Sequence, residues 1–194
     1  MQGEEFLNEI RKKLEELEEA REELIKLSRE LRINSTRAIA AVHAGNFEEA
    51  KRKLKAAIDL LEKVKAYKKY PEIYGIANDA MQELAEALSF FSLISGQDIP
   101  NLREIGIEDA AILTGLGDVV GELRRHALDL MRRGDVSRAE KCIDVMEEIY
   151  SALITFTFPE KLVPGLRHKV DVARQLIERT KSDLLAAKLI NKLG

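Results

Sequence analysis

Residues 113–135, LTGLGDVVGELRRHALDLMRRGD, decide the fold of this chain. Apolar side chains recur here every three or four residues, the spacing that places them on one face of an α-helix. Gly134, which follows the last apolar residue of the stretch, is a typical helix end. The pattern predicts a helix from about Glu108 to Arg133 with one buried stripe, formed by Ile112, Leu116, Val119, Leu123, Ala127 and Leu130.

The same helical spacing continues on both sides of this stretch. Glycine and proline fall at the breaks between helical segments, and we expect the one strand-like run, ITFTF at 154–158, at a helix end or turn. Long helices with short connections favour antiparallel neighbours, so we expect an all-α fold, an antiparallel bundle of about six to seven long helices. We expect one domain over residues 1–194. The expected helices are residues 4–44, 46–68 with Asn46 as N-cap, 71–93, 108–133, 136–154 with Asp135 as N-cap, and 166–193.

The composition narrows the possible functions. The chain has 194 residues, 34% of them charged, and its net charge of −3 argues against binding nucleic acid through overall positive charge. The single cysteine, Cys142, excludes a disulfide within the chain and favours a reducing compartment. The apolar runs are too short to span a membrane, and the His and Cys spacing of a zinc site is missing. We expect a cytoplasmic protein without membrane association.

Four acidic residues lie in or beside predicted apolar stripes, where a carboxylate without a partner is costly. Glu83 and Glu86 lie one turn apart in the helix predicted over 71–93, and Asp118 and Glu122 lie one turn apart in the helix over 108–133. If these two helices pack together, the four carboxylates converge, and they cannot all stay ionised unless cations hold them. Mg²⁺ or Mn²⁺ would suit such oxygen ligands and could promote phosphodiester hydrolysis.

Three glycines, Gly115, Gly117 and Gly121, lie close to the second pair of acids. Each costs up to ~1 kcal/mol in a helix interior, and such glycines often permit close approach of another helix or a ligand. The alternative is that the acids share this spacing by chance in a charge-rich chain. Arg124 and Arg125 could then pair with them in ordinary salt bridges.

A basic run in the helix over 46–68 is the candidate nucleic-acid surface. Phosphate contacts would make binding salt-dependent and largely independent of base sequence. The alternative is an ordinary solvated face, because two glutamates just precede the run and can pair with it. The candidate residues are Lys51, Arg52, Lys53 and Lys55 in the run, with Arg21 and Arg29 of the first helix.

Four segments resemble the translin family, and they are closest to its translin-associated factor X branch. They are REELIKLSRELRINSTRAIAAVHAG (21–45), QELAEALSF (82–90), LTGLGDVVGELRRHALDLMRRGD (113–135) and IYSALITF (149–156). The most specific feature is D-x-x-G-E-L at 118–123, preceded by E-x-x-E-A-x-S-F at 83–90. The resemblance covers residues 21–188, nearly the whole chain.

The resemblance implies an all-helical subunit of an octamer-like shell that binds single-stranded RNA and DNA. In the translin-associated factor X branch it also implies a Mg²⁺-dependent endoribonuclease. The catalytic, metal-binding acids of that branch correspond to Glu83, Glu86 and Asp118, with Glu122 as a further ligand. Animal members pair two different subunits, so a single chain suggests a homo-oligomer, as in microbial and archaeal members. The family's second basic region is here YPEIYGIAND (70–79), which carries no positive charge, so this chain departs from the family's nucleic-acid track in that segment.

We therefore predict an endoribonuclease subunit, dependent on Mg²⁺ or Mn²⁺, that cleaves single-stranded RNA inside an oligomeric shell. The alternative is a non-catalytic oligomer that binds single-stranded RNA or DNA, with the acids in salt bridges between helices. A purely structural helical adaptor is a third possibility, and it would bind no RNA at low salt.

Overall fold

The structure is a computed structural model that describes the backbone of residues 2–193 and the side chains of residues 4–190. Every regular element in this part of the chain is a helix, which confirms the predicted all-α class. The α-helices are α1 (Gln2–His43), α2 (Phe47–Lys65), α3 (Pro71–Tyr74), α4 (Asn78–Ile94), α5 (Leu102–Ile105), α6 (Asp109–Arg132), α7 (Val136–Leu153) and α8 (Leu166–Leu193). Two 3₁₀ turns, η1 (Ala66–Lys69) and η2 (Gly75–Ala77), flank α3.

The two predicted N-caps are confirmed. The Asn46 side chain accepts a hydrogen bond from the Glu49 amide at 3.1 Å, and the Asp135 side chain accepts one from the Arg138 amide at 3.2 Å. Each bond satisfies a backbone donor that has no partner inside its helix. The run ITFTF lies at the end of α7 and in the loop that follows, as predicted.

The prediction of one continuous α-helix over 71–93 is wrong, although every residue of this range is helical. The chain forms the single turn α3, tightens into η2 at Gly75–Ala77, and only then begins α4. The change from α-helical to 3₁₀ hydrogen bonding begins at Gly75, and glycine is a poor helix former. In the same way, the helix predicted to reach residue 68 ends at Lys65 and continues as η1.

The short helix α5 has no counterpart in the prediction. It begins at the N-cap Asn101, whose side chain accepts a hydrogen bond from the Arg103 amide at 3.2 Å. It ends at Gly106, which has a φ of 99° that side-chain-bearing residues rarely adopt. Four residues are too few for an apolar period to be visible in the sequence.

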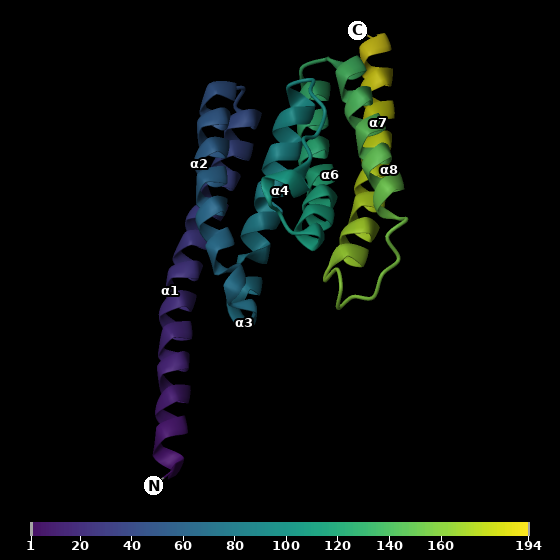
Figure 1. Cartoon of the computed structure of the whole chain (residues 1–194). Helices are drawn as coiled ribbons and strands as arrows, with labels where there is room; N and C mark the ends of the chain where they lie inside the picture. Colours follow the sequence, from purple (N-terminus) through teal and green to yellow (C-terminus); the bar gives the residue numbers. More distant parts are fainter. Residues whose placement is uncertain (1, 194) are drawn as a thin grey trace.

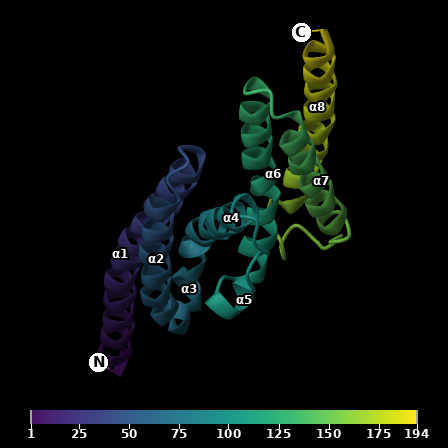
Figure 2. The same cartoon turned by 90° about the horizontal axis from the view of Figure 1, so that it is seen from above.

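The helices pack in a row across the molecule (Figures 1 and 2). The pair α1 and α2 lies at one side, α4 lies between this pair and α6, and α7 and α8 cover the other side of α6. The core runs through this row, and its largest fully buried side chains include Leu31, Leu61, Phe90, Leu123 and Met146. The helix α6 is therefore central, in contact with both α4 and α8.

The first part of α1 extends beyond the packed body of the molecule (Figure 1). Its apolar residues Phe6, Leu7, Ile10 and Leu14 are about half exposed or more, and the buried stripe of α1 begins only at Leu24. At the other end of the molecule, Leu185, Leu189 and Ile190 of α8 are also exposed. No helix in the described part of the chain has the length and apolar character to cross a membrane.

Candidate functional site

Gly115 lets α4 and α6 approach each other closely. A Cβ atom at this position would lie 2.6 Å from the carbonyl oxygen of Gln82 and 2.8 Å from the Cβ of Ala85. Real Cβ atoms essentially never come this close to other atoms, so a larger residue would push the helices apart. The expected close approach at this glycine is therefore present, and it brings the face of α4 that carries Glu86 next to α6.

Gly117 does the same on the other side of α6, toward α8. A Cβ atom here would lie 2.9 Å from the Cβ of Lys169. The third glycine, Gly121, differs, because its Cβ would meet only Leu176 at an ordinary 4.0 Å. Two of the three glycines thus make room for a neighbouring helix.

Asp118 follows Gly117 and lies where α4, α6 and α8 meet. The Lys169 ammonium donates hydrogen bonds to both Asp118 carboxylate oxygens, at 2.5 and 2.7 Å. The Gln82 amide donates to Asp118 Oδ2 at 2.7 Å. One carboxylate therefore receives donors from the helices on both sides of α6, and Lys169 supplies the positive charge nearest to it.

Glu86 is the buried member of the four acids, with 8% of its surface exposed. Burial raises its pKa from the ordinary 4.5 to about 9, and the charges of Asp118, Glu83 and Glu122 act in the same direction. The Lys169 charge opposes them. The interaction between two charges falls off with distance, so the three carboxylates that act on Glu86 lie near it. The structure thus brings Glu83, Glu86, Asp118 and Glu122 together, and we call these four residues the acidic cluster.

The partner of Glu122 comes from α1. His43 Nε2 lies 2.5 Å from Glu122 Oε2, and the His43 side chain is almost fully buried. The imidazole packs on the ring of Phe90, with ring centres 4.8 Å apart. Its Nδ1 atom is buried and has no hydrogen-bond partner among the described residues. With Glu122 ionised, Nε2 is therefore the protonated nitrogen that donates to it.

Glu83 also has its partner on α1. Thr36 Oγ1 lies 2.7 Å from Glu83 Oε1. Thr36 and His43 are seven residues apart, so they lie two turns apart on the same face of α1. The sequence analysis missed both residues. The only available signal was this shared face, which continues past the buried Ile39.

The arginines considered as partners of the acids are placed differently. Arg124 pairs with Asp183 at 2.9 Å and donates to Thr180 at 2.7 Å, so it contacts α8 rather than the acidic cluster. Arg125 reaches Glu122 only at 4.0 Å and is itself exposed. The acids therefore contact Lys169 and His43 rather than these two arginines.

The side chains of the acidic cluster, as they lie, do not form a ready metal site. Among the described residues no three His, Cys, Asp or Glu side chains are arranged so that they could together hold a metal ion. Asp118, Glu122 and Glu83 are each turned toward a protein donor. The chemistry of the donor set nevertheless fits a hard divalent cation, because all four groups offer oxygen, and burial followed by three neighbouring carboxylates raises the pKa of Glu86 in a way that a cation would oppose.

The basic run on α2 (Lys51, Arg52, Lys53 and Lys55) is largely paired with its own helix. Lys51 lies 3.1 Å from Glu48, Lys53 lies 3.7 Å from Glu49, and Arg52 also binds Glu49. Lys55 is exposed. On α1, Arg21 pairs with Glu22 at 2.7 Å, and Arg29 is exposed. The expected pairing with the preceding glutamates is present, and a role in nucleic-acid binding stays a prediction.

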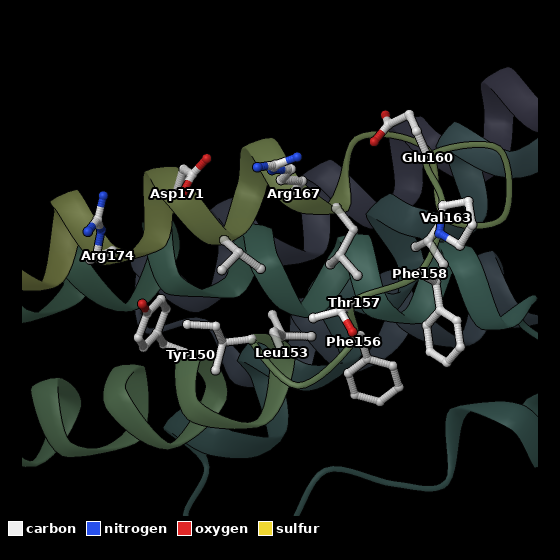
Figure 3. Close-up of a pocket in the computed structure, with 14 residues that line it drawn as sticks. Tyr150, Leu153, Phe156, Thr157, Phe158, Glu160, Val163, Arg167, Asp171 and Arg174 are labelled. Carbon is white, nitrogen blue, oxygen red and sulfur yellow. The ribbon is translucent and has the colours of Figure 1, made fainter.

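A cavity of about 620 Å³ lies apart from the acidic cluster (Figure 3). It is bounded by the end of α7, the loop over 154–165 and the beginning of α8. Tyr150, Phe156 and Phe158 form its aromatic side, and Arg167 and Arg174 lie along α8. No member of the acidic cluster lines it.

The comparisons with known proteins agree with this geometry. The sequence profile of the translin family matches residues 19–184. The chain belongs to the translin family. It is similar to uncharacterised protein MJ0175 of Methanocaldococcus jannaschii, with 32% identity over 181 residues that cover 92% of this chain and 81% of that protein.

Solved structures of the translin type share the fold. AfC3PO has been solved by itself and in a complex with duplex RNA. In each case it is 57% identical, with a TM-score of 0.90 over 95% of this chain and 97% of that chain. Apo-NeC3PO, at 24% identity, has a TM-score of 0.85 over 93% of this chain and 96% of that chain, which shows the common fold alone.

Proposed function

We propose that this translin-family chain is a Mg²⁺-dependent endoribonuclease subunit, as in the translin-associated factor X branch, with Mn²⁺ as a possible substitute. The observation that carries the proposal is Glu86, a buried carboxylate whose pKa is raised by burial and then by three neighbouring carboxylates. Carboxylates this close together are unfavourable when all of them are ionised, and a bound cation would compensate their charge. A carboxylate with a strongly raised pKa is also a typical feature of functional sites. The four acidic residues would hold the cation through their oxygens.

A bound divalent cation supplies the positive charge that stabilises the negative charge developing on a phosphodiester during hydrolysis. The chain's own residues provide the setting. His43 orients Glu122, and Gln82 orients Asp118. The oxygen of a water molecule would form a bond to the phosphorus and one P–O ester bond would break; one proton of the water ends on the leaving oxygen as a hydroxyl and the other is released, so that one RNA strand becomes two.

RNA is the proposed substrate class. AfC3PO, 57% identical to this chain, has been solved with duplex RNA, which supports RNA as a ligand here. We propose that cleavage acts on single-stranded RNA, and that single-stranded DNA also binds. The basic run on α2, with Arg21 and Arg29, would contact phosphates.

We further propose that the chain works as a homo-oligomer, an octamer-like shell of the translin type. The exposed apolar residues at the first part of α1 and at the end of α8 support this proposal. Exposed apolar residues that recur along one helix are a usual basis for subunit contacts.

A second candidate function is RNA binding without cleavage. It is favoured by a specific observation, namely that Asp118, Glu122 and Glu83 each already have a protein donor. In that case the acidic cluster would serve only to hold α1, α4, α6 and α8 together.

Cleavage of an end-labelled RNA by the pure protein separates the two candidates. Single-stranded and duplex RNA would be incubated in Mg²⁺ and in EDTA with the wild type, Asp118→Asn and the control Asp144→Asn, which changes an exposed acid on α7. We expect cleavage of the single strand in Mg²⁺ only, and a loss of at least about 100-fold in Asp118→Asn, since even indirect partners of metal ligands contribute 10–100-fold. Binding without cleavage would favour the second candidate, and cleavage by Asp118→Asn at the wild-type rate would contradict the first.

A further inference from the structure

Lys169 differs from most lysines in that its side chain is largely buried and its ammonium binds a carboxylate of the acidic cluster. It lies near the beginning of α8, and its side chain is 23% exposed. Its ammonium spans both oxygens of Asp118, at 2.5 and 2.7 Å. The other lysines of α8 with ion pairs, Lys181 and Lys188, bind acids near the surface of α7 instead.

The backbone around Lys169 is shaped for this contact. Gly117 leaves the space that the Lys169 Cβ occupies, and the next residue of α6 is Asp118 itself. Any side chain at position 117 would push α8 away and lengthen the distance from Nζ to the carboxylate. The placement of the ammonium is thus a consequence of how α6 and α8 pack, rather than a chance contact of a flexible surface chain.

The ammonium also bears on the rest of the acidic cluster. Its charge acts on Glu86 against the combined effect of burial and the other three carboxylates. A lysine carries its charge at the tip of a flexible four-carbon stem, so Nζ can leave a partner without moving the backbone. Lys169 therefore combines a defined resting position with the freedom to leave it.

A divalent cation bound by the acidic cluster would need the same Asp118 oxygens that Lys169 now spans. Because the ammonium already bonds to both oxygens and Gln82 also donates to Oδ2, a divalent cation coordinated by Asp118 would lie close to Nζ, and the two positive charges would repel each other. We propose that Lys169 is a tethered counter-cation that competes with the divalent cation for Asp118 and leaves this carboxylate when the cation binds. This inference rests on the proposed function, because it assumes that the acidic cluster takes up a divalent cation.

The first test measures Mg²⁺ binding through thermal unfolding of Lys169→Met, which keeps most of the apolar stem and removes the charge. Lys181→Met is the matched control, since Lys181 lies on the same helix and pairs with Glu147 at 2.5 Å outside the acidic cluster. In EDTA we expect Lys169→Met to unfold about 2–4 °C or more below Lys181→Met, because Asp118 is left unpaired. Under Mg²⁺ titration, a ligand that binds only the folded state raises the unfolding temperature.

The expected result is that Lys169→Met shows the same rise in unfolding temperature as the wild type, each relative to its own value in EDTA, at a Mg²⁺ concentration at least about tenfold lower. Tenfold corresponds to ~1.4 kcal/mol, a modest value for a competing ionic contact. Lys181→Met should match the wild type. If Lys169→Met needs as much Mg²⁺ as the wild type, or more, the competition is overturned while the Mg²⁺-dependent function stands.

The second test needs no variant and decides the question if Lys169→Met does not fold. The wild type would be acetylated with an N-hydroxysuccinimide ester, with and without saturating Mg²⁺, and labelling of each lysine followed by mass spectrometry. We expect Mg²⁺ to increase the labelling rate of Lys169 and to leave Lys181 unchanged. If Mg²⁺ stabilises the protein but does not increase the labelling rate of Lys169, the competition is overturned and the Mg²⁺-dependent function is not. If Mg²⁺ stabilises neither the wild type nor Lys169→Met, both this inference and the Mg²⁺-dependent function are overturned.

Discussion

The acidic cluster and the basic run on α2 are both dense in charge, but they hold their charges in opposite ways. In the acidic cluster the partners come from distant parts of the sequence: Lys169 lies on α8, and His43 and Thr36 lie on α1. In the basic run the partners are Glu48 and Glu49, three or four residues away on the same helix.

The difference shows which charges depend on the packing of the helices: those of the acidic cluster do, and those of the basic run do not. A same-helix pair forms wherever two opposite charges lie one turn apart, and in water it contributes only tenths of a kcal/mol. A buried carboxylate must instead be matched by the packing of several helices, because leaving it unmatched is costly. Changes in the acidic cluster should therefore alter stability strongly, and changes in the basic run should alter it little.

The largest effect should be the pH dependence that Glu86 gives to stability. Its pKa lies near 9 in the folded protein, raised from about 4.5 chiefly by burial. Between these values the folded state holds a proton that the unfolded chain has released, so stability falls as the pH rises, by about 1.4 kcal/mol per pH unit. In EDTA we expect this group to lower the free energy of unfolding by about 3 kcal/mol from pH 6 to pH 8, measured by urea unfolding.

Glu86→Gln should lose this slope, because a neutral amide does not titrate, whereas Glu148→Gln, an exposed acid on α7, should keep it. Mg²⁺ should make the wild-type slope shallower, because a nearby cation favours the ionised carboxylate. An identical pH slope in Glu86→Gln and the wild type would mean that Glu86 is ionised in the folded protein.

The next largest effect should come from the helix contact beneath the acidic cluster. Gly115→Ala places a Cβ atom 2.6 Å from the Gln82 carbonyl oxygen, and relief requires α4 and α6 to separate. We expect a loss of about 2 kcal/mol in the free energy of unfolding, a typical value for overpacking. Gly121→Ala on the same helix is the matched control. Its Cβ meets only Leu176 at 4.0 Å, so it should gain about 0.5–1 kcal/mol. Equal effects of the two substitutions would show that helix propensity, rather than close packing, governs these positions.

Much of the fold could be predicted from the sequence, because apolar residues recur every three or four positions along the buried face of a long helix. The stripe on α6 is buried at Val119, Leu123 and Ala127 as predicted, and Cys142 is a core residue. The break at Gly75 was not predictable in the same way. Whether a single glycine interrupts a helix depends on tertiary packing, which overrides propensity.

The site could be predicted only in part, for a related reason. Periodicity predicts that Glu86 lies in an apolar stripe and that Asp118 lies at the edge of one, but it does not show which helix each one meets. Lys169 is 51 residues from Asp118 in the sequence, and His43 is 79 residues from Glu122. These residues meet because α1 and α8 pack around α4 and α6. The sequence pattern does not predict that arrangement of the helices.

The smallest effect on stability should come from the basic run itself. Replacing Lys51, Arg52, Lys53 and Lys55 by alanine together removes exposed ion pairs of low value. We expect the free energy of unfolding, measured in urea, to change by no more than about 1 kcal/mol in total. A larger decrease would show that these side chains stabilise α2 beyond their pairing with Glu48 and Glu49.

RNA affinity should respond differently to the same fourfold substitution, because each phosphate that the protein neutralises adds to the salt dependence of binding. If the basic run binds RNA, its removal should weaken binding and reduce the slope of log affinity against log salt by roughly one for each phosphate that is no longer neutralised. Filter binding from low to moderate salt measures that slope, and alanine at Lys141 and Lys161, exposed lysines outside α1 and α2, is the control. An unchanged slope would assign the basic run to an ordinary solvated face and move the search for the RNA surface to Arg21 and Arg29 on α1.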